Sequence, residues 1–119
     1  MQSGKLSLPT LTLERVMTDK ELLELAAKAA GIEHSDKHTD EAGSLYVHAL
    51  GKMWNPLTDD GDALRLAVRL NVHIELHDDL VRVWYANGEC VELHFNPGDK
   101  QGAARRAIVL AAVEIGKSL

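Results

Sequence analysis

The spacing of apolar residues changes twice along the chain, and each change marks a change in the predicted secondary structure. Apolar positions recur at helical spacing over residues 18–30 and again up to Leu70. From Val72 to Phe95 they alternate with polar positions, which is the period of a β-strand. Helical spacing returns over residues 101–115. The pattern therefore predicts two helices, then a sheet, then a third helix.

The first helix has clear signals at both ends. Thr18 and Glu21 match a capping box, in which the hydroxyl and the carboxylate accept backbone N–H groups at the helix start. Gly31 follows the last helical position and is typical of a helix stop. We therefore predict this helix over residues 18–30. Its expected buried face is formed by Leu22, Leu25, Ala26 and Ala29.

The second helix follows the least informative part of the chain. Residues 33–44 are polar and turn-rich and predict an exposed loop, while residues 45–54 predict a short helical turn or a short strand. Either Asn55 before a proline or Thr58 before two aspartates can cap the helix. Its apolar stripe is wide, which predicts deep burial. The stripe consists of Ala63, Leu64, Leu66, Ala67, Val68 and Leu70.

Three strands follow in a meander with two tight turns. Asp78-Asp79 marks the first turn and Asn87-Gly88 the second. We prefer a three-residue loop containing Gly88, because an odd-length loop places the apolar residues of both flanking strands on one face. That face then carries Val81, Val83, Tyr85, Val91, Leu93 and Phe95.

The third helix is predicted over residues 101–115, with Asp99 as its cap and Gly116 at its end. Its expected buried side consists of Ala104, Ile108, Ala111 and Ile115. The predicted fold is α+β, a three-stranded antiparallel β-meander packed with three helices in the order α-α-β-β-β-α. We predict a single domain over residues 17–119, preceded by an N-terminal extension, residues 1–16, that is a candidate for disorder.

Two stretches of the chain resemble a known group of proteins. The first, W-N-P-L-T-D-D-G-D-A-L-R-L-A-V, begins at Trp54, and the second, A-A-R-R-A-I-V-L-A-A-V-E-I-G, begins at Ala103. With the meander between them, they resemble small phage and prophage proteins that are similar to the phage α-β-α sandwich domain, whose function is unassigned. The resemblance covers about residues 17–32 and 53–116. Its motifs are capping and packing signals, so it implies no catalytic residues.

Composition narrows the classes of function. The chain has 119 residues, of which 45% are apolar and 26% charged, values close to those of a globular domain. Its formal charge of −5 argues against a broad electrostatic contact with nucleic acid. The single cysteine, Cys90, excludes an intramolecular disulfide. We expect a cytoplasmic protein, in a bacterial host if phage-encoded, because no segment matches a membrane span or a secretory signal.

The face of the sheet opposite the valines carries the main candidate site. His73, Glu75 and His77 alternate along the first strand, and Arg82 and Trp84 lie on the same face of the next strand. The third strand adds Cys90, Glu92 and His94. Three interpretations are open: a partner-binding surface, a metal site, and a solvated or helix-covered face. The metal site is the less favoured, because no specific zinc-ligand spacing is present.

Other groups of polar residues have simpler explanations. His34 and His38 stand four residues apart without the H-E-x-x-H order of zinc proteases, and we assign them to a loop. The aspartates of residues 59–62 lack the order of a calcium loop and are explained by helix capping. The chain has no phosphate loop, dinucleotide turn or nucleophile elbow. We therefore expect no catalytic residues, no metal and no cofactor.

These observations rank three hypotheses for function. The first is a binding protein of phage or prophage type that acts on a protein partner, such as a host factor. The second is a structural homo-oligomer joined through an unpaired edge of the meander. The third is a small metal-binding domain or metal-dependent enzyme that uses His73, Glu75 and His77. We expect neither nucleic acid nor a membrane as partner.

Overall fold

The computed structural model describes residues 17–86 and 88–119, so the predictions made for residues 1–16 lie outside the described part. In chain order the elements are α2 (Asp19–Ala30), β1 (Ser35–Thr39), β2 (Leu45–Val47), β3 (Lys52–Trp54), α3 (Asp60–Leu70), β4 (His73–Leu76), β5 (Leu80–Ala86), β6 (Glu89–His94), the 3₁₀ turn η1 (Pro97–Asp99) and α4 (Lys100–Lys117). The strands form two antiparallel sheets, β1-β2-β3 and β4-β5-β6. The predicted α+β class is confirmed, and the first of these sheets was not predicted.

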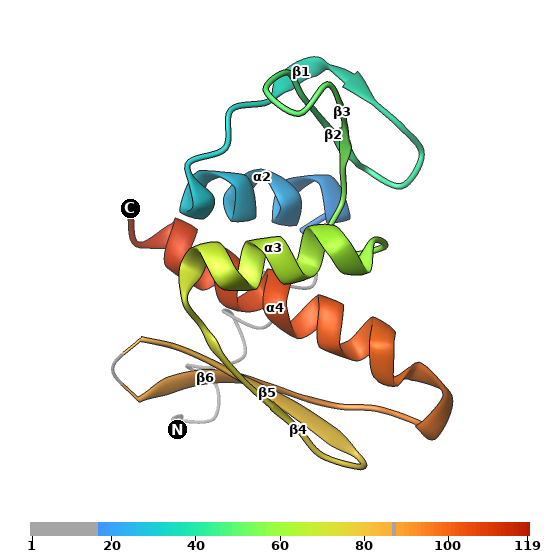
Figure 1. Cartoon of the computed structure of the whole chain (residues 1–119), viewed down its shortest axis with the longest axis vertical. Helices are drawn as coiled ribbons and strands as arrows, with labels where there is room; N and C mark the ends of the chain where they lie inside the picture. Colours follow the sequence, from blue (N-terminus) through green and yellow to red (C-terminus); the bar gives the residue numbers. More distant parts are fainter. Residues whose placement is uncertain (1–16, 87) are drawn as a thin grey trace, which may run out of the picture.

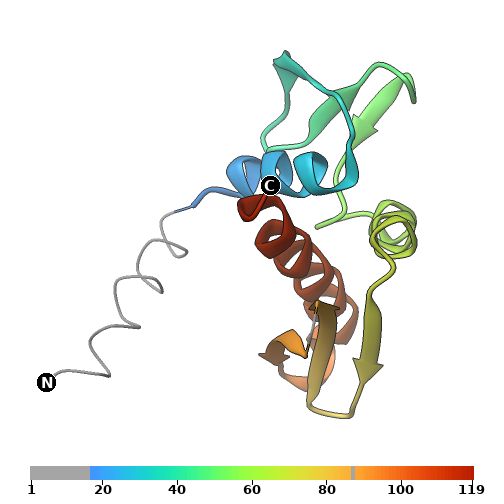
Figure 2. The same cartoon turned by 90° about the vertical axis from the view of Figure 1, so that its left-hand side faces the viewer.

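Helix α4 lies at the centre of the described part of the protein. Helices α2 and α3 cover one side of α4, and the sheet β4–β6 covers the other (Figure 1, Figure 2). Because two sides are covered, the buried residues of α4 do not form a single stripe. They are Ala107, Ile108, Val109, Ala111, Ala112, Val113 and Gly116. The predicted buried side was therefore too narrow, and two of its members, Ala104 and Ile115, are only partly buried.

Gly116 lies where α4 approaches α2 most closely. A Cβ atom added at this position would overlap the backbone oxygen of Leu25. The sequence predicted that the helix ends at this glycine, but the helix continues to Lys117. At the other end of α4, Asp99 occupies the cap position without the expected side-chain hydrogen bond. Gly116 thus serves the contact between two helices rather than the termination of one.

Helix α2 has the predicted ends. Thr18 Oγ1 accepts from the Glu21 N–H at 3.1 Å, and Glu21 Oε1 accepts from the Thr18 N–H at 2.8 Å. Gly31 follows in the left-handed conformation with φ of 69°. The buried face is shifted from the predicted one: Leu25 and Ala29 are only partly buried, and the buried residues are Leu22, Leu23, Ala26, Ala27 and Ala30. Local capping signals fixed the helix bounds, whereas the packing of other elements fixed its buried face.

The sheet β4–β6 is the predicted meander. Val83 pairs with Val91, and Val81 pairs with Leu93. These side chains therefore share one face of the sheet, as predicted. The register shifts between Trp84 and Ala86, an irregularity of the kind that a β-bulge produces. The predicted three-residue loop includes residue 87, which lies outside the described part of the chain.

The segment between α2 and α3 forms a sheet. Strand β2 pairs with β1 on one side and with β3 on the other, antiparallel in both cases. The strand alternative for residues 45–54 is confirmed over Leu45–Val47 and Lys52–Trp54, with a turn over residues 48–51 between them. The exposed loop predicted for residues 33–44 is wrong over Ser35–Thr39, which forms β1. All three strands are short and β1 is entirely polar, so the apolar periodicity was too weak to reveal them.

Local polar contacts close the turn between β1 and β2. The carboxylate of Asp40 accepts the backbone N–H groups of Ala42 and Ser44 at 3.1 and 2.9 Å. Gly43 has a φ of 79°, and a Cβ atom there would lie 2.9 Å from the backbone nitrogen of Lys20. A larger residue would therefore be strained and would push the turn away from the start of α2.

A buried aspartate joins the start of α3 to this first sheet. The Asp62 side chain is 3% exposed and accepts the N–H of Asn55 at 3.0 Å. The amide nitrogen of Asn55 donates to Ser44 Oγ at 2.9 Å. Arg65 and Lys52 place positive charge 2.9 and 3.5 Å from Asp62 Oδ1. The buried carboxylate is thus hydrogen-bonded and charge-compensated, as buried charges must be.

Helix α3 is less covered than predicted. Its N-cap is Asp59, one residue beyond the later of the two predicted caps, and Asp59 Oδ2 accepts the N–H of Asp62 at 2.8 Å. The deep burial expected for its whole apolar stripe is wrong at Leu64 and Val68, which are 60% and 71% exposed. The stripe was too wide for the one side of α3 that faces α4.

Gly116→Ala is expected to lower the free energy of unfolding by about 1–3 kcal/mol, because the added methyl group must push α4 away from α2. Gly102→Ala, in the same helix, is the matched control, since a Cβ there meets only Arg105 Nη2 at 3.7 Å. This control is expected to gain about 0.5–1 kcal/mol from the better helix propensity of alanine. Urea unfolding of both variants measures the difference, and effects of the same sign would contradict the close helix contact.

Asp62→Ala is expected to lower the free energy of unfolding by about 2–4 kcal/mol, because it leaves the buried N–H of Asn55 without a partner and removes a charge pair. Asp99→Ala is the control, since the Asp99 side chain makes no capping hydrogen bond. The control is expected to change stability by less than about 0.5 kcal/mol. Thermal and urea unfolding measure the stability of both variants. If Asp62→Ala leaves the free energy of unfolding unchanged, this network does not stabilise the fold.

Candidate functional site

The residues predicted to form a site come together on the outer face of the sheet β4–β6. In the register of the sheet, His73 lies opposite Trp84, and Glu75 lies opposite Arg82. His77 follows the last residue of β4, and its Nε2 is 3.5 Å from Glu75 Oε1. Four of the five predicted residues therefore share one strand face, and His77 reaches it from the following turn.

Opposite charges on this face are paired. Arg82 Nε donates to Glu92 Oε1 at 2.7 Å, and Arg82 Nη1 lies 3.4 Å from Glu75 Oε1. On the far side of Glu92, His94 Nε2 lies 3.0 Å from the second carboxylate oxygen. Arg82 thus sits between two carboxylates, each of which also has a histidine beside it.

The pKa values of the two carboxyl groups follow from this pairing. The hydrogen bond from Arg82 is the main cause that lowers the pKa of Glu92, and His94 adds to it. At Glu75, desolvation raises the pKa, but Arg82, Trp84 and His77 together lower it below its ordinary value. The indole Nε1 of Trp84 has no partner of ordinary hydrogen-bond geometry in the described part. We therefore attribute the lowered pKa of Glu75 mainly to Arg82.

This face does not gather metal ligands. Within residues 17–86 and 88–119, no three histidine, cysteine, aspartate or glutamate side chains are arranged to hold a metal ion. The carboxylates of Glu75 and Glu92 are held by Arg82 instead. The second histidine pair cannot be compared in this way, because the side chain of His38 lies outside the described part. The metal hypothesis therefore has no structural support here.

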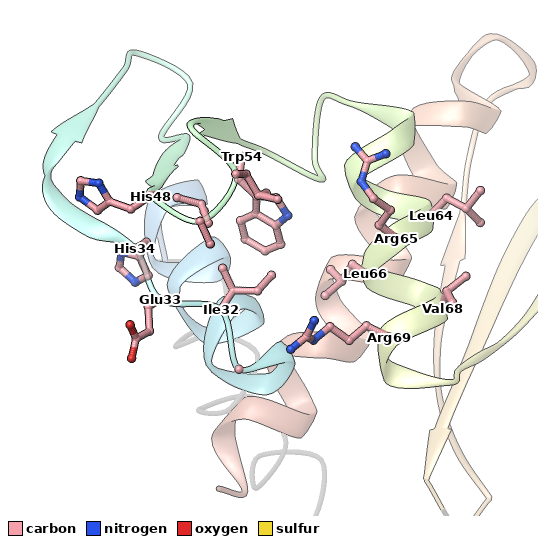
Figure 3. A pocket seen from close by; sticks show the side chains of 14 residues that line it. Ile32, Glu33, His34, His48, Trp54, Leu64, Arg65, Leu66, Val68 and Arg69 are labelled. Atoms are coloured by element: carbon pink, nitrogen blue, oxygen red, sulfur yellow. The ribbon is translucent and has the colours of Figure 1, made fainter.

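A second surface, the α3 groove, was not predicted from the sequence. The end of α2 and the β2–β3 hairpin form one wall and α3 forms the other, around a volume of about 930 Å³ (Figure 3). We define the α3 groove by its main apolar residues, Ile32, Leu50, Trp54, Leu64, Leu66 and Val68. Its size and apolar lining are those of a binding site.

The apolar side chains of the α3 groove take two positions. Trp54 and Leu66 are buried, and they point toward Ile32 across the groove (Figure 3). Leu64 and Val68 lie on the outer side of α3 and extend the apolar surface beyond the groove (Figure 3). On the opposite rim, Leu50 is 51% exposed. The groove therefore has a rigid floor and exposed apolar edges.

Two arginines of α3 border the groove. Arg69 Nε donates to the carbonyl oxygen of Ala30 at the end of α2, and its guanidinium reaches across beneath Ile32 (Figure 3). Arg65 Nη2 pairs with Asp62 at 2.9 Å. The remaining polar residues of the lining are Glu33, His34 and His48.

The sequence contained one signal of the α3 groove that could have been used. The apolar stripe of α3 spans more of the helix circumference than one neighbouring helix can cover, so part of it had to face another element or solvent. The opposite wall could not be predicted, because the sequence of residues 45–54 is compatible with either a strand or a helical turn. Only pairing of β2 with β3 brings Leu50 and Trp54 to the groove.

Comparison of the chain with family models, with curated proteins and with solved structures gives no match. None of the helices in the described part is long and apolar enough to cross a membrane. The function must therefore be inferred from the chemistry of the two surfaces.

The paired carboxylates predict a pH dependence of stability. Glu75 and Glu92 have pKa values below the ordinary 4.5, so near pH 4 the folded chain binds fewer protons than the unfolded chain. Their contribution is therefore present above about pH 4.5 and is lost as the pH falls through the lowered pKa values. Arg82→Gln is expected to lower the melting temperature at pH 7, and this loss should shrink at pH 3.

Circular dichroism melts at both pH values measure the effect. Arg106→Gln is a matched control, because it removes another exposed arginine, 3.7 Å from Asp19. The control should change the melting temperature less at pH 7. A deficit of Arg82→Gln that stays constant from pH 7 to pH 3 would show that Arg82 does not act through these carboxylates.

Proposed function

We propose that this protein is an accessory protein of phage or prophage type that acts by binding another protein, and that the α3 groove is its docking surface. The observation that carries the proposal is the apolar rim, where Leu50, Leu64 and Val68 are each more than half exposed around an apolar floor. Exposed apolar side chains gathered beside a groove mark interaction sites in proteins. The resemblance of the Trp54 and Ala103 stretches to phage proteins supports the proposed origin.

Binding is favoured over catalysis by the content of the two surfaces. The α3 groove is lined mainly by aliphatic residues and Trp54, which supply contact area rather than chemically reactive groups. Arg65 is engaged by Asp62, and Arg69 by the end of α2. A surface of this kind recognises shape and apolar groups, which is the role of a docking site.

The α3 groove is favoured over the strand face for an energetic reason. On the outer face of the sheet β4–β6, here called the strand face, Arg82 is already paired with Glu75 and Glu92. A partner that covered this face would remove water from three charges without offering them a better arrangement. In the α3 groove, a partner would remove water mainly from apolar surface, which is favourable at roughly 25 cal/mol per Å².

The double variant Leu64→Glu, Val68→Glu is expected to abolish partner capture, because it places charges on the apolar rim. Both residues are exposed, so the fold should be retained, which circular dichroism checks. The full chain and the variant would be used as baits in extract from a bacterial host, followed by quantitative mass spectrometry. Proteins enriched by the full chain should fall by at least roughly tenfold with the variant.

The matched control is the double variant Arg82→Ala, Trp84→Ala on the strand face. This control should retain the same captured proteins at unchanged levels. If the control loses them and the α3 variant keeps them, the docking surface is the strand face and the proposal for the α3 groove is wrong.

A further inference from the structure

We infer that the segment received by the α3 groove is an amphipathic helix with an apolar face and an acidic flank. This inference rests on the proposed function and names the chemistry of the partner. It is carried by the charges beside the groove, by the way its walls are built, and by the poor fit of two alternative occupants.

The lining of the α3 groove is more basic than the chain as a whole. The formal net charge of the protein is −5. The lining contains two arginines, Arg65 and Arg69, and a single acidic residue, Glu33. Arg65 is already paired with Asp62 at 2.9 Å, so Arg69 is the cation left to attract an acidic segment and to disfavour a basic one, which sets partner choice more than overall affinity.

Arg69 still has N–H groups available for hydrogen bonds with a partner. Its Nε donates to the Ala30 carbonyl oxygen, which holds the guanidinium plane in place. In the described part of the chain, no carboxylate forms an ion pair with Arg69. The remaining N–H groups of this fixed guanidinium can therefore accept a carboxylate, for which its fork geometry is suited.

A helical partner fits the walls of the groove better than an extended one. The walls consist of side chains from α3, the end of α2 and the β2–β3 hairpin. An extended segment needs backbone partners for its own N–H and C=O groups. A helix satisfies these groups internally and needs only side-chain contacts. Leu64 and Val68 stand one turn apart, a spacing that the ridges of a second helix match.

A second copy of this chain is disfavoured as the occupant. Arg65 and Arg69 lie four residues apart on the same side of α3, so they form one basic flank. In a two-fold contact the same surface meets itself. Arginines that lie near the two-fold axis would then approach their own copies, and the like charges would oppose the contact there.

Residues 1–16 also lack the required chemistry. This segment carries Lys5, Glu14 and Arg15, so it has one more basic than acidic residue. Its charge is opposite to that expected of the occupant. The partner segment is therefore assigned to another protein.

A selection experiment with peptides tests the inference. The full chain would be immobilised and offered a display library of 16-residue helical peptides with leucines fixed at positions i, i+3, i+4 and i+7. The flanking positions would vary among Glu, Gln and Lys. We expect the selected peptides to be enriched in Glu on one flank and depleted in Lys. Their binding should be lost with the Leu64→Glu, Val68→Glu variant.

Affinities of one selected peptide and its Glu-to-Lys counterpart then measure the charge preference. The Glu peptide should bind on the order of tenfold more tightly, and the preference should shrink in 0.5 M salt. Arg65→Gln and Arg69→Gln should each reduce the ratio of the two affinities. The salt dependence measured with the unaltered chain keeps the test decisive if either variant destabilises the fold, since Arg65 pairs with the buried Asp62 and Arg69 with the end of α2.

The outcomes separate the two proposals. Peptides that bind in the groove without a preference for Glu would overturn the acidic partner and leave the docking surface intact. Selection of no peptide that depends on Leu64 and Val68 would overturn the docking surface as well. Native mass spectrometry that shows a dimer abolished by Leu64→Glu would replace the acidic helix with a second copy.

Discussion

The packing of α4 is the constraint on which the rest of the structure depends. This helix contributes small and branched apolar residues to contacts on two sides, with α2 and α3 on one and the sheet β4–β6 on the other. The contact with α2 is close enough that Gly116 has no room for a side chain. Because interiors are packed at the density of organic crystals, this approach fixes the position of α2. The end of α2 in turn supplies one wall of the α3 groove.

The buried polar network around Asp62 gives the α3 groove its other elements. Asp62 binds the backbone of Asn55, and Asn55 binds Ser44, so the start of α3 and the first sheet are held together. Hydrogen bonds in a buried site are directional, unlike apolar contacts, and they set the orientation of the hairpin relative to α3. Asn55 and Asp62 therefore have a structural role, which is to position the walls of the α3 groove.

The two candidate surfaces differ in how many of their charged side chains are already paired within the protein. On the strand face, Arg82 holds Glu75 and Glu92, and the network closes on itself. In the α3 groove, the apolar rim is exposed and the guanidinium of Arg69 faces no carboxylate of the described part. A partner gains most where burial removes apolar surface from water and where a charge still lacks a counterion. This difference is what favours the groove as the docking surface.

The sequence by itself determined the elements whose signals are local. The capping box of Thr18 and Glu21, the stop at Gly31 and the alternation from Val72 to Phe95 depend on neighbours within a few residues, and all of them predicted the structure correctly. The tertiary structure alone decided which apolar faces were covered. It turned residues 35–54 into a sheet through pairing, left Leu64 and Val68 exposed, and converted the expected helix stop at Gly116 into a helix contact. Burial depends on which distant elements meet, and that information is not present in the spacing of residues along one element.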